Sequence, residues 1–175
     1  MRHDFPVTIF EGPDGSGKTT LAKWYAEKTR AVYVHCGPVP DFDGKMLQQY
    51  YLDAMEPALR GRRPVVMDRC WVSEPIYGCA FRGGLDRLGA AKRVALEMTA
   101  AARDAVVVLC RPPLETCLTS WRARHADGDE YVTAEAIMTA IWQAYGDIYI
   151  TGLPVVNYDY TRDNRDELVE RVLAL

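Results

Sequence analysis

The most informative segment of the sequence is a glycine-rich run near its beginning. Residues 12–19 read Gly-Pro-Asp-Gly-Ser-Gly-Lys-Thr and match the pattern G-x-x-x-x-G-K-[ST] in full. The glycines allow a tight turn in which successive backbone N–H groups point at one oxyanion. In such a loop the lysine reaches the β- and γ-phosphates of a nucleotide, and the next hydroxyl is a ligand of Mg²⁺. The run therefore predicts a loop that holds ATP and Mg²⁺, with Lys18 catalytic and Thr19 a metal ligand.

The elements expected on either side of this loop support the prediction. The apolar residues 7–10 predict a strand that ends at the loop, and residues 20–25 predict a helix that follows it. The first turn of that helix adds the positive end of its dipole to the phosphate site. The residues predicted to bind the nucleotide are Gly12, Asp14, Gly15, Ser16, Gly17, Lys18, Thr19 and Thr20.

A second pair of residues suited to this chemistry follows another apolar run. Residues 64–67 read Pro-Val-Val-Met and lead directly into Asp68 and Arg69. An aspartate at the tip of a strand beside a phosphate-binding loop holds Mg²⁺ through water. An arginine next to it can clamp a phosphate with two parallel hydrogen bonds. We expect both residues to be catalytic, Asp68 on the metal and Arg69 on a phosphate; a helix cap or a solvated loop charge is the alternative for Asp68.

The elements that must position these residues can be read from five short apolar runs. Such runs, apolar throughout rather than at alternate positions, are typical of parallel strands buried on both faces. They lie at residues 7–10, 31–34, 64–67, 105–110 and 154–158. Segments with helical spacing separate them, for example Phe42, Met46, Tyr50 and Ala54. The alternation predicts an α/β fold of the P-loop NTPase type, a three-layer sandwich with a five-stranded parallel sheet, in one domain over residues 1–175.

At the two chemical segments the sequence resembles the thymidylate-kinase-like branch of the nucleoside monophosphate kinases. Residues 10–20, Phe-Glu-Gly-Pro-Asp-Gly-Ser-Gly-Lys-Thr-Thr, resemble that branch's F-E-G-x-x-G-x-G-K-T-T. Asp68-Arg69, followed by Ser73 and Tyr77-Gly78, resembles its D-R-x-x-x-S-x-x-x-Y-G element. The order of strands and helices agrees along most of the chain, whereas the specific likeness is confined to these segments and, more loosely, to a lid.

The resemblance implies an enzyme in which ATP donates its γ-phosphoryl group to a deoxynucleoside monophosphate. Arg69 would hold the acceptor phosphate, while Ser73 and Tyr77 would lie near the acceptor sugar or base. Glu11, in the shared F-E-G, is placed with these substrate-binding residues.

The family's polar base-reading residue is not evident after the tyrosine, because residues 78–80 read Gly-Cys-Ala. Phe81 could instead stack on the base, and Arg82 could donate hydrogen bonds to its carbonyl groups. A place in the hydrophobic core is an equal alternative for Phe81. The base therefore stays open at this point.

A lid is predicted at about residues 122–132. A helical segment ends in Trp121-Arg122-Ala123-Arg124-His125, and residues 126–130 then read Ala-Asp-Gly-Asp-Glu. A basic helix end followed by a polar, glycine-containing segment is typical of a lid that closes over phosphates and excludes water. Because the phosphate-binding loop holds no arginine, Arg122 and Arg124 are predicted to neutralise charge in the transition state. Solvated charges that favour the helix dipole are the alternative.

Proteins with two other functions also contain a phosphate-binding loop of this kind. One is a kinase of a hydroxyl acceptor, either a deoxynucleoside 5′-hydroxyl or a hydroxyl-bearing modified base in DNA. A hydroxyl needs a carboxylate to take its proton, and Asp68 or Glu11 could serve. The other is a P-loop binding or switch protein without kinase activity. The many arginines and few candidate bases favour the monophosphate acceptor, since it is already ionised.

Composition limits the partners. The net charge of −3 gives no global electrostatic argument for nucleic-acid binding, so a small nucleotide is the expected partner and nucleic acid only under the hydroxyl alternative. No apolar run approaches the roughly 18 residues that cross a bilayer, and the first residues lack a signal-peptide core. We therefore expect a cytoplasmic protein without a membrane partner. The sequence leaves open a homodimer, the role of His35 and that of the cluster Arg60, Arg62 and Arg63.

Overall fold

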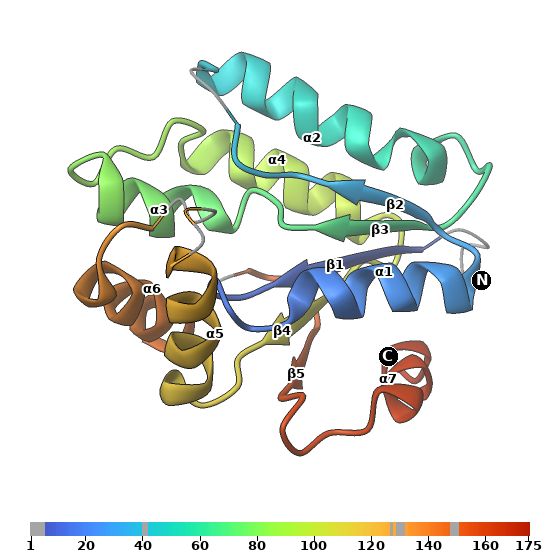
Figure 1. Ribbon diagram of the computed structural model, residues 1–175. Helices are drawn as coiled ribbons and strands as arrows, with labels where there is room; N and C mark the ends of the chain where they lie inside the picture. Colours follow the sequence, from blue (N-terminus) through green and yellow to red (C-terminus); the bar gives the residue numbers. More distant parts are fainter. Residues whose placement is uncertain (1–5, 40–41, 127, 129–131, 148–150) are drawn as a thin grey trace.

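Five parallel strands form a sheet in the order β2-β3-β1-β4-β5 (Figure 1). The computed structural model describes residues 6–39, 42–126, 128, 132–147 and 151–175. Each strand overlaps its predicted run, which confirms the predicted five-stranded α/β sandwich. The strands are β1 Val7–Glu11, β2 Val32–His35, β3 Val65–Asp68, β4 Val106–Cys110 and β5 Val155–Tyr158.

Helices cover both faces of the sheet. One face packs against α1 (Lys18–Thr29) and α7 (Arg165–Leu173). The helices that pack on the other side are α2 Gly44–Leu59, α3 Ser73–Phe81, α4 Ala90–Ala101, α5 Leu114–Ala126 and α6 Glu135–Asp147. Of these, α5 and α6 lie side by side beyond the ends to which the strand arrows point (Figure 1). None of the described helices has the length and apolar character needed to span a membrane.

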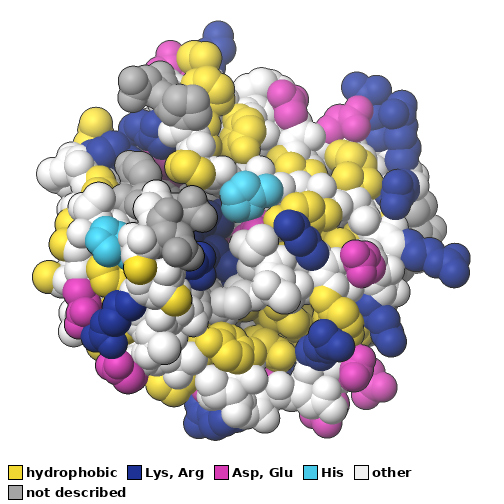
Figure 2. Space-filling view, in the orientation of Figure 1, with side chains coloured by type: hydrophobic (Ala, Val, Ile, Leu, Met, Phe, Trp, Pro, Cys, Tyr) yellow, Lys and Arg dark blue, Asp and Glu magenta, His cyan; other side chains and the backbone are white. Residues whose placement is uncertain are grey.

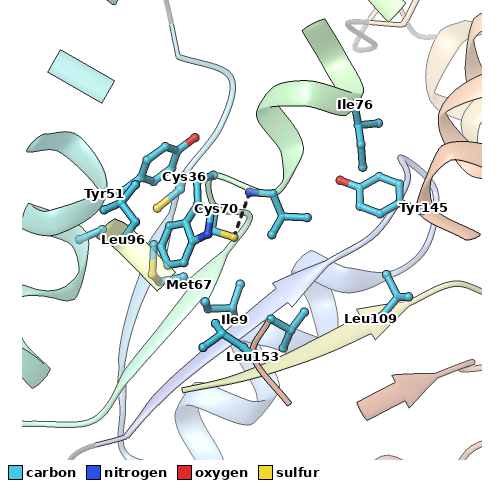
Figure 3. Close-up of a cluster of buried hydrophobic side chains, with 14 of the residues drawn as sticks. Ile9, Cys36, Tyr51, Met67, Cys70, Ile76, Leu96, Leu109, Tyr145 and Leu153 are labelled. Carbon is cyan, nitrogen blue, oxygen red and sulfur yellow. Dashed lines mark hydrogen bonds between the residues drawn. The ribbon is translucent and has the colours of Figure 1, made fainter. Parts of the chain in front are cut away.

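The alternation of side chains along the strands fills both layers of the core. Successive residues of a strand point to opposite faces, so Val7 and Ile9 join the larger hydrophobic cluster while Phe10 joins the smaller one beneath α1 and α7. Figure 3 shows part of the larger cluster, with Met67 from β3 and Tyr51 from α2 among its members. Burial on both faces explains why the strand sequences are apolar throughout.

Helix α2 buries only part of the predicted stripe, because Ala54 is buried and Tyr50 packs against the core whereas Met46 does not. Met46, placed in the predicted stripe, has an exposed fraction of 50%. The buried residues of the helix are Leu47, Tyr51, Ala54, Met55 and Ala58. Apolar side chains occupy two neighbouring stripes of this helix, so spacing could not choose between them. Packing against α4 and β3 makes the choice.

Helix α3 was not predicted, although it forms one wall of the site. Its sequence contains Pro75 and Gly78, both unfavourable in helix interiors. Pro75 is tolerated because it lies in the first turn, where its missing N–H is not needed. Gly78 is required by packing, since a Cβ atom there would lie 2.4 Å from the carbonyl oxygen of Leu85.

Candidate active site

The phosphate-binding loop connects β1 to α1, as predicted. Gly17 precedes α1 with a φ of 74°. Lys18, the first residue of α1, is buried, and its Nζ donates a hydrogen bond to the carbonyl oxygen of Pro13 at 3.1 Å. The Ser16 hydroxyl is also buried and has no hydrogen-bond partner among the described residues. An unsatisfied buried hydroxyl beside a buried ammonium group fits a loop that holds phosphate.

Two glycines allow other segments to approach this loop closely. Gly12 has a φ of 146°, and a Cβ atom there would lie 2.1 Å from the carbonyl oxygen of Cys110. Gly15 has a φ of 74°, and its Cβ atom would lie 2.4 Å from the carbonyl oxygen of Cys117. A side chain at either position would collide with backbone that cannot move aside cheaply. The loop is therefore wedged between the end of β4 and helix α5.

Asp68 ends β3 and is fully buried beside the loop. Burial alone would raise the pKa of its carboxyl group, but interactions with His35, Thr19 and Lys18 outweigh burial and lower the pKa to about 2. Its Oδ1 atom has no hydrogen-bond partner among the described residues. An ionised carboxylate with one unsatisfied oxygen, next to the Thr19 hydroxyl, is the oxygen donor set that Mg²⁺ prefers. The residues present therefore fit a magnesium ion that accompanies a nucleotide.

Arg69 lies between the loop and α3. Its backbone φ is 74°, a left-handed conformation that is uncommon for a residue with a side chain and tends to occur at functional sites. Its guanidinium group donates hydrogen bonds to the carbonyl oxygen of Gly12 at 3.3 Å and to the carboxylate of Asp14. The same group lies 4.9 Å from the centre of the Tyr77 ring. These contacts fix the positive charge directly beside the phosphate-binding loop.

Glu11 is the centre of a buried hydrogen-bond network. Its Oε1 accepts from the backbone N–H of Cys70 at 2.7 Å, and its Oε2 accepts from the hydroxyl groups of Tyr145 at 2.8 Å and Ser73 at 3.0 Å. The carboxylate thereby ties β1 to the segment after β3 and to α6. Tyr145 was not predicted as a site residue, because it is separated from Glu11 by 134 positions and belongs to no motif.

Asp14 lies at the junction of the loop and α3. The sequence analysis expected it only to bind nucleotide, but its carboxylate accepts hydrogen bonds from the Tyr77 hydroxyl at 2.8 Å and from Arg69. Burial opposes ionisation of this carboxyl group, yet the charges of Arg69 and Lys18 and the Tyr77 hydrogen bond lower its pKa to about 2. Asp14 is therefore ionised at neutral pH and couples the loop to α3.

A pocket opens beside these residues, between α3 and the segment that follows β2. Four of the predicted substrate-binding residues line this pocket, namely Arg69, Ser73, Tyr77 and Arg82. Cys36 and Gly37 form part of the opposite wall. Figure 2 shows a hollow near the centre of the face in view, with Lys or Arg side chains inside it.

Glu74 adds an ion cluster to the pocket that the sequence analysis missed. It is 5% exposed, and its carboxylate accepts hydrogen bonds from Arg82 at 2.9 Å and Arg87 at 2.7 Å. Arg87 also donates to the carbonyl oxygen of Val39 at 3.3 Å, on the other side of the pocket. The available signal was its position directly after Ser73, because Glu74 is the acidic residue in the first turn of α3.

The chain is similar in fold to several solved structures. No protein-family model and no curated protein matches the sequence. YorR from Bacillus subtilis, solved in complex with phosphorylated GDP, has a TM-score of 0.75 at 21% identity, over 96% of this chain and 94% of that chain. A deoxyadenosine kinase from M. mycoides with bound dCTP has a TM-score of 0.60 at 16% identity, over 96% and 98% of the two chains. The chain has the fold of the P-loop kinases. An unliganded sugar kinase from Janibacter sp. extends this likeness, with a TM-score of 0.57 at 17% identity over 97% and 93% of the chains.

The two arginines predicted in the lid, Arg122 and Arg124, lie in different surroundings. Residues 127 and 129–131 of the predicted lid lie outside the described part of the chain. Arg122 is exposed and donates hydrogen bonds to Glu115 at 2.8 Å and to Glu135 at 2.9 Å. Burial, Arg69 and Lys18 dominate the pKa of Asp14, and the charge of Arg124 adds to its lowering. The structure therefore brings Arg124 toward the phosphate-binding loop and places Arg122 in a surface ion-pair network.

The remaining predicted residues have less direct positions. Phe81 stacks on Tyr77 with a centroid distance of 6.1 Å and packs against the larger hydrophobic cluster, as its core alternative expected. Thr20 is exposed on the first turn of α1. The cluster Arg60, Arg62 and Arg63 lies exposed before the beginning of β3, at the end of that strand opposite Asp68.

Proposed function

We propose that the chain is an ATP- and Mg²⁺-dependent kinase that phosphorylates a deoxynucleoside monophosphate to the diphosphate. The observation that carries the proposal is the placement of Arg69. Its partly buried guanidinium group contacts the phosphate-binding loop at Gly12 and at the same time lines the pocket on α3. A bidentate cation in this position is suited to hold an acceptor phosphate next to the γ-phosphate of the donor.

On the donor side, the chain's own residues would bind and orient the triphosphate. Lys18 contacts the loop through its hydrogen bond to Pro13, and the Ser16 hydroxyl has no hydrogen-bond partner among the described residues. Thr19 and Asp68 would hold the magnesium ion, which would supply positive charge to neutralise the phosphates. Arg124 would close on the loop as the arginine that stabilises charge in the transition state.

The carboxylates of the site favour an ionised acceptor over a hydroxyl. A general base works best with a pKa near the working pH, but the pKa values of Asp14 and Asp68 are about 2. Glu11 is fully buried and already accepts hydrogen bonds from Cys70, Ser73 and Tyr145. A monophosphate needs cations rather than a base, and Arg69 supplies one.

The thymidylate-like base preference is part of the proposal. Glu74 engages Arg82 and Arg87 through both of its oxygens, which fixes two guanidinium groups, a class of N–H donor, on this wall of the pocket. Such donors suit the carbonyl oxygens of thymine or uracil. Tyr77, whose hydroxyl is fixed by Asp14, would lie against the deoxyribose.

A kinase of a hydroxyl acceptor is the second candidate. The structural likeness to a deoxyadenosine kinase and to a sugar kinase favours it. In that case one of the engaged carboxylates would have to exchange its partners when the acceptor binds. The monophosphate comes first because Arg69 contacts the phosphate-binding loop and lines the pocket, and the low pKa values of Asp14 and Asp68 support this order.

Product analysis tests the proposed function. The full chain is incubated with ATP and Mg²⁺ and, separately, with each deoxynucleoside, each monophosphate and a short DNA that carries hydroxymethylated bases. The products are then identified by mass. We expect a diphosphate from thymidine monophosphate and no product with Lys18→Ala, because that variant lacks the cation beneath the loop. ADP release without any phosphorylated acceptor would contradict kinase function.

A further inference from the structure

Two side chains of β2 lie next to Asp68 because of the strand register. β2 pairs with β3 in parallel, with His35 opposite Asp68 and Tyr33 opposite Val66. Residues two positions apart on a strand share a face. Val66 and Tyr33 pack in the smaller hydrophobic cluster under α1, so His35 and Asp68 lie on that same face. Helix α1 begins there with Lys18 and Thr19.

Both β2 side chains contact the same oxygen of Asp68. The Tyr33 hydroxyl donates to Oδ2 at 2.8 Å, and Nδ1 of His35 lies 2.9 Å from that atom. Because an ionised carboxylate can only accept, Nδ1 carries the proton in this contact. The other oxygen, Oδ1, has no partner among the described residues. Two donors on Oδ2 therefore fix the plane of the carboxylate and leave Oδ1 for a ligand.

Two hydrogen bonds of the backbone around His35 do not involve the Asp68 carboxylate. The N–H of Cys36 donates to the carbonyl oxygen of Asp68 at 2.8 Å, and the Tyr50 hydroxyl donates to the carbonyl oxygen of His35 at 3.3 Å. The His35 side chain is 46% exposed, so it adds little to the hydrophobic core. Its contact with a fully buried carboxylate is the feature that needs an explanation.

We propose that Tyr33 and His35 are positioning residues that orient Asp68 toward the magnesium ion of the bound nucleotide. The inference rests on the proposed function, in which Asp68 acts on that ion. Hydrogen-bond partners of metal-binding groups typically account for about 10–100-fold in metal affinity or activity. Without either donor, Asp68 would keep its charge but lose its fixed orientation, and the ion would be held less well.

The test measures how much magnesium contributes to nucleotide binding in the full chain. Calorimetry gives the Kd of ADP in EDTA and in Mg²⁺, and the ratio of the two Kd values is the metal contribution. His35→Ala and Tyr33→Phe should each lower this ratio by about tenfold. His35→Asn should restore part of it, because its amide can donate in place of Nδ1. Tyr50→Phe is the matched control, since it removes a hydroxyl beside His35 without touching Asp68, and should leave the ratio unchanged.

Asp68→Asn separates this inference from the proposed function. If Asp68→Asn lowers the ratio while His35→Ala and Tyr33→Phe do not, the positioning role is overturned and the metal role of Asp68 stands. If Asp68→Asn also leaves the ratio unchanged, the metal role fails and the inference fails with it. Circular dichroism checks that each variant is folded. If His35→Ala does not fold, the test uses Tyr33→Phe and His35→Asn instead. Because ADP is the ligand, the outcome does not depend on which acceptor the kinase uses.

Discussion

Arg122 and Arg124, separated by one residue on α5, point to different partners. Side chains two positions apart on a helix do not face each other. Arg122 pairs with Glu115 and Glu135 on the surface, whereas the charge of Arg124 acts on Asp14 in the phosphate-binding loop. We therefore expect Arg124, rather than Arg122, to stabilise charge in the transition state.

The first prediction separates these two residues by kinetics. Arg124→Ala should lower kcat by about a hundredfold or more, because a cation aimed at developing charge acts mainly in the transition state. Arg122→Ala should leave kcat close to that of the unchanged protein, since exposed ion pairs contribute little. Steady-state rates with saturating ATP and acceptor decide the matter. Equal losses of kcat in both variants would contradict the assignment.

The second prediction concerns the stability of the phosphate-binding loop. Gly15→Ala should lower the free energy of unfolding by about 1–3 kcal/mol, because its Cβ atom would meet the carbonyl oxygen of Cys117 at 2.4 Å. Gly83→Ala is the control for a positive φ, since Gly83 has a φ of 57° and nothing within 4 Å of its Cβ position. Urea unfolding of both variants gives the comparison. If both variants lose the same free energy of unfolding, the contact between residue 15 and α5 adds nothing to the cost of the substitution.

The third prediction is a loss of stability in acid. The pKa values of Asp14 and Asp68 fall from 3.8 to about 2 in the folded chain. Lowered carboxyl pKa values stabilise the fold above pH 4, and this stability is lost as the pH falls from about 4 toward 2. Each group accounts for about 2 kcal/mol. Urea unfolding between pH 7 and pH 2.5 should show the loss, and Asp14→Asn should make the dependence shallower; an unchanged slope would contradict the lowered pKa of Asp14.

Sequence patterns predicted the strands and the phosphate-binding loop well, and the contacts between side chains less well. The five apolar runs sufficed for the strands because buried parallel strands are apolar throughout. The glycine-rich loop and Asp68-Arg69 were recognisable because their chemistry requires fixed residue types at fixed spacing. Glu74 and Tyr145 were missed because their roles arise from contacts between elements distant in the sequence. The face of α2 was misread in part for a similar reason, since packing and not spacing selects Leu47 over Met46.

The assignment of the acceptor rests on Arg69, and one comparison tests it most directly. The kcat/KM values for thymidine, thymidine monophosphate and a hydroxymethylated DNA are measured side by side with the unchanged protein, Arg69→Ala and Arg69→Lys. We predict that the monophosphate is preferred, that Arg69→Ala abolishes this preference, and that Arg69→Lys restores it only in part, because an ammonium group cannot reproduce the bidentate fork. A preference of the unchanged protein for either hydroxyl substrate by more than about tenfold, or roughly 1.4 kcal/mol of transition-state binding, would contradict a monophosphate kinase.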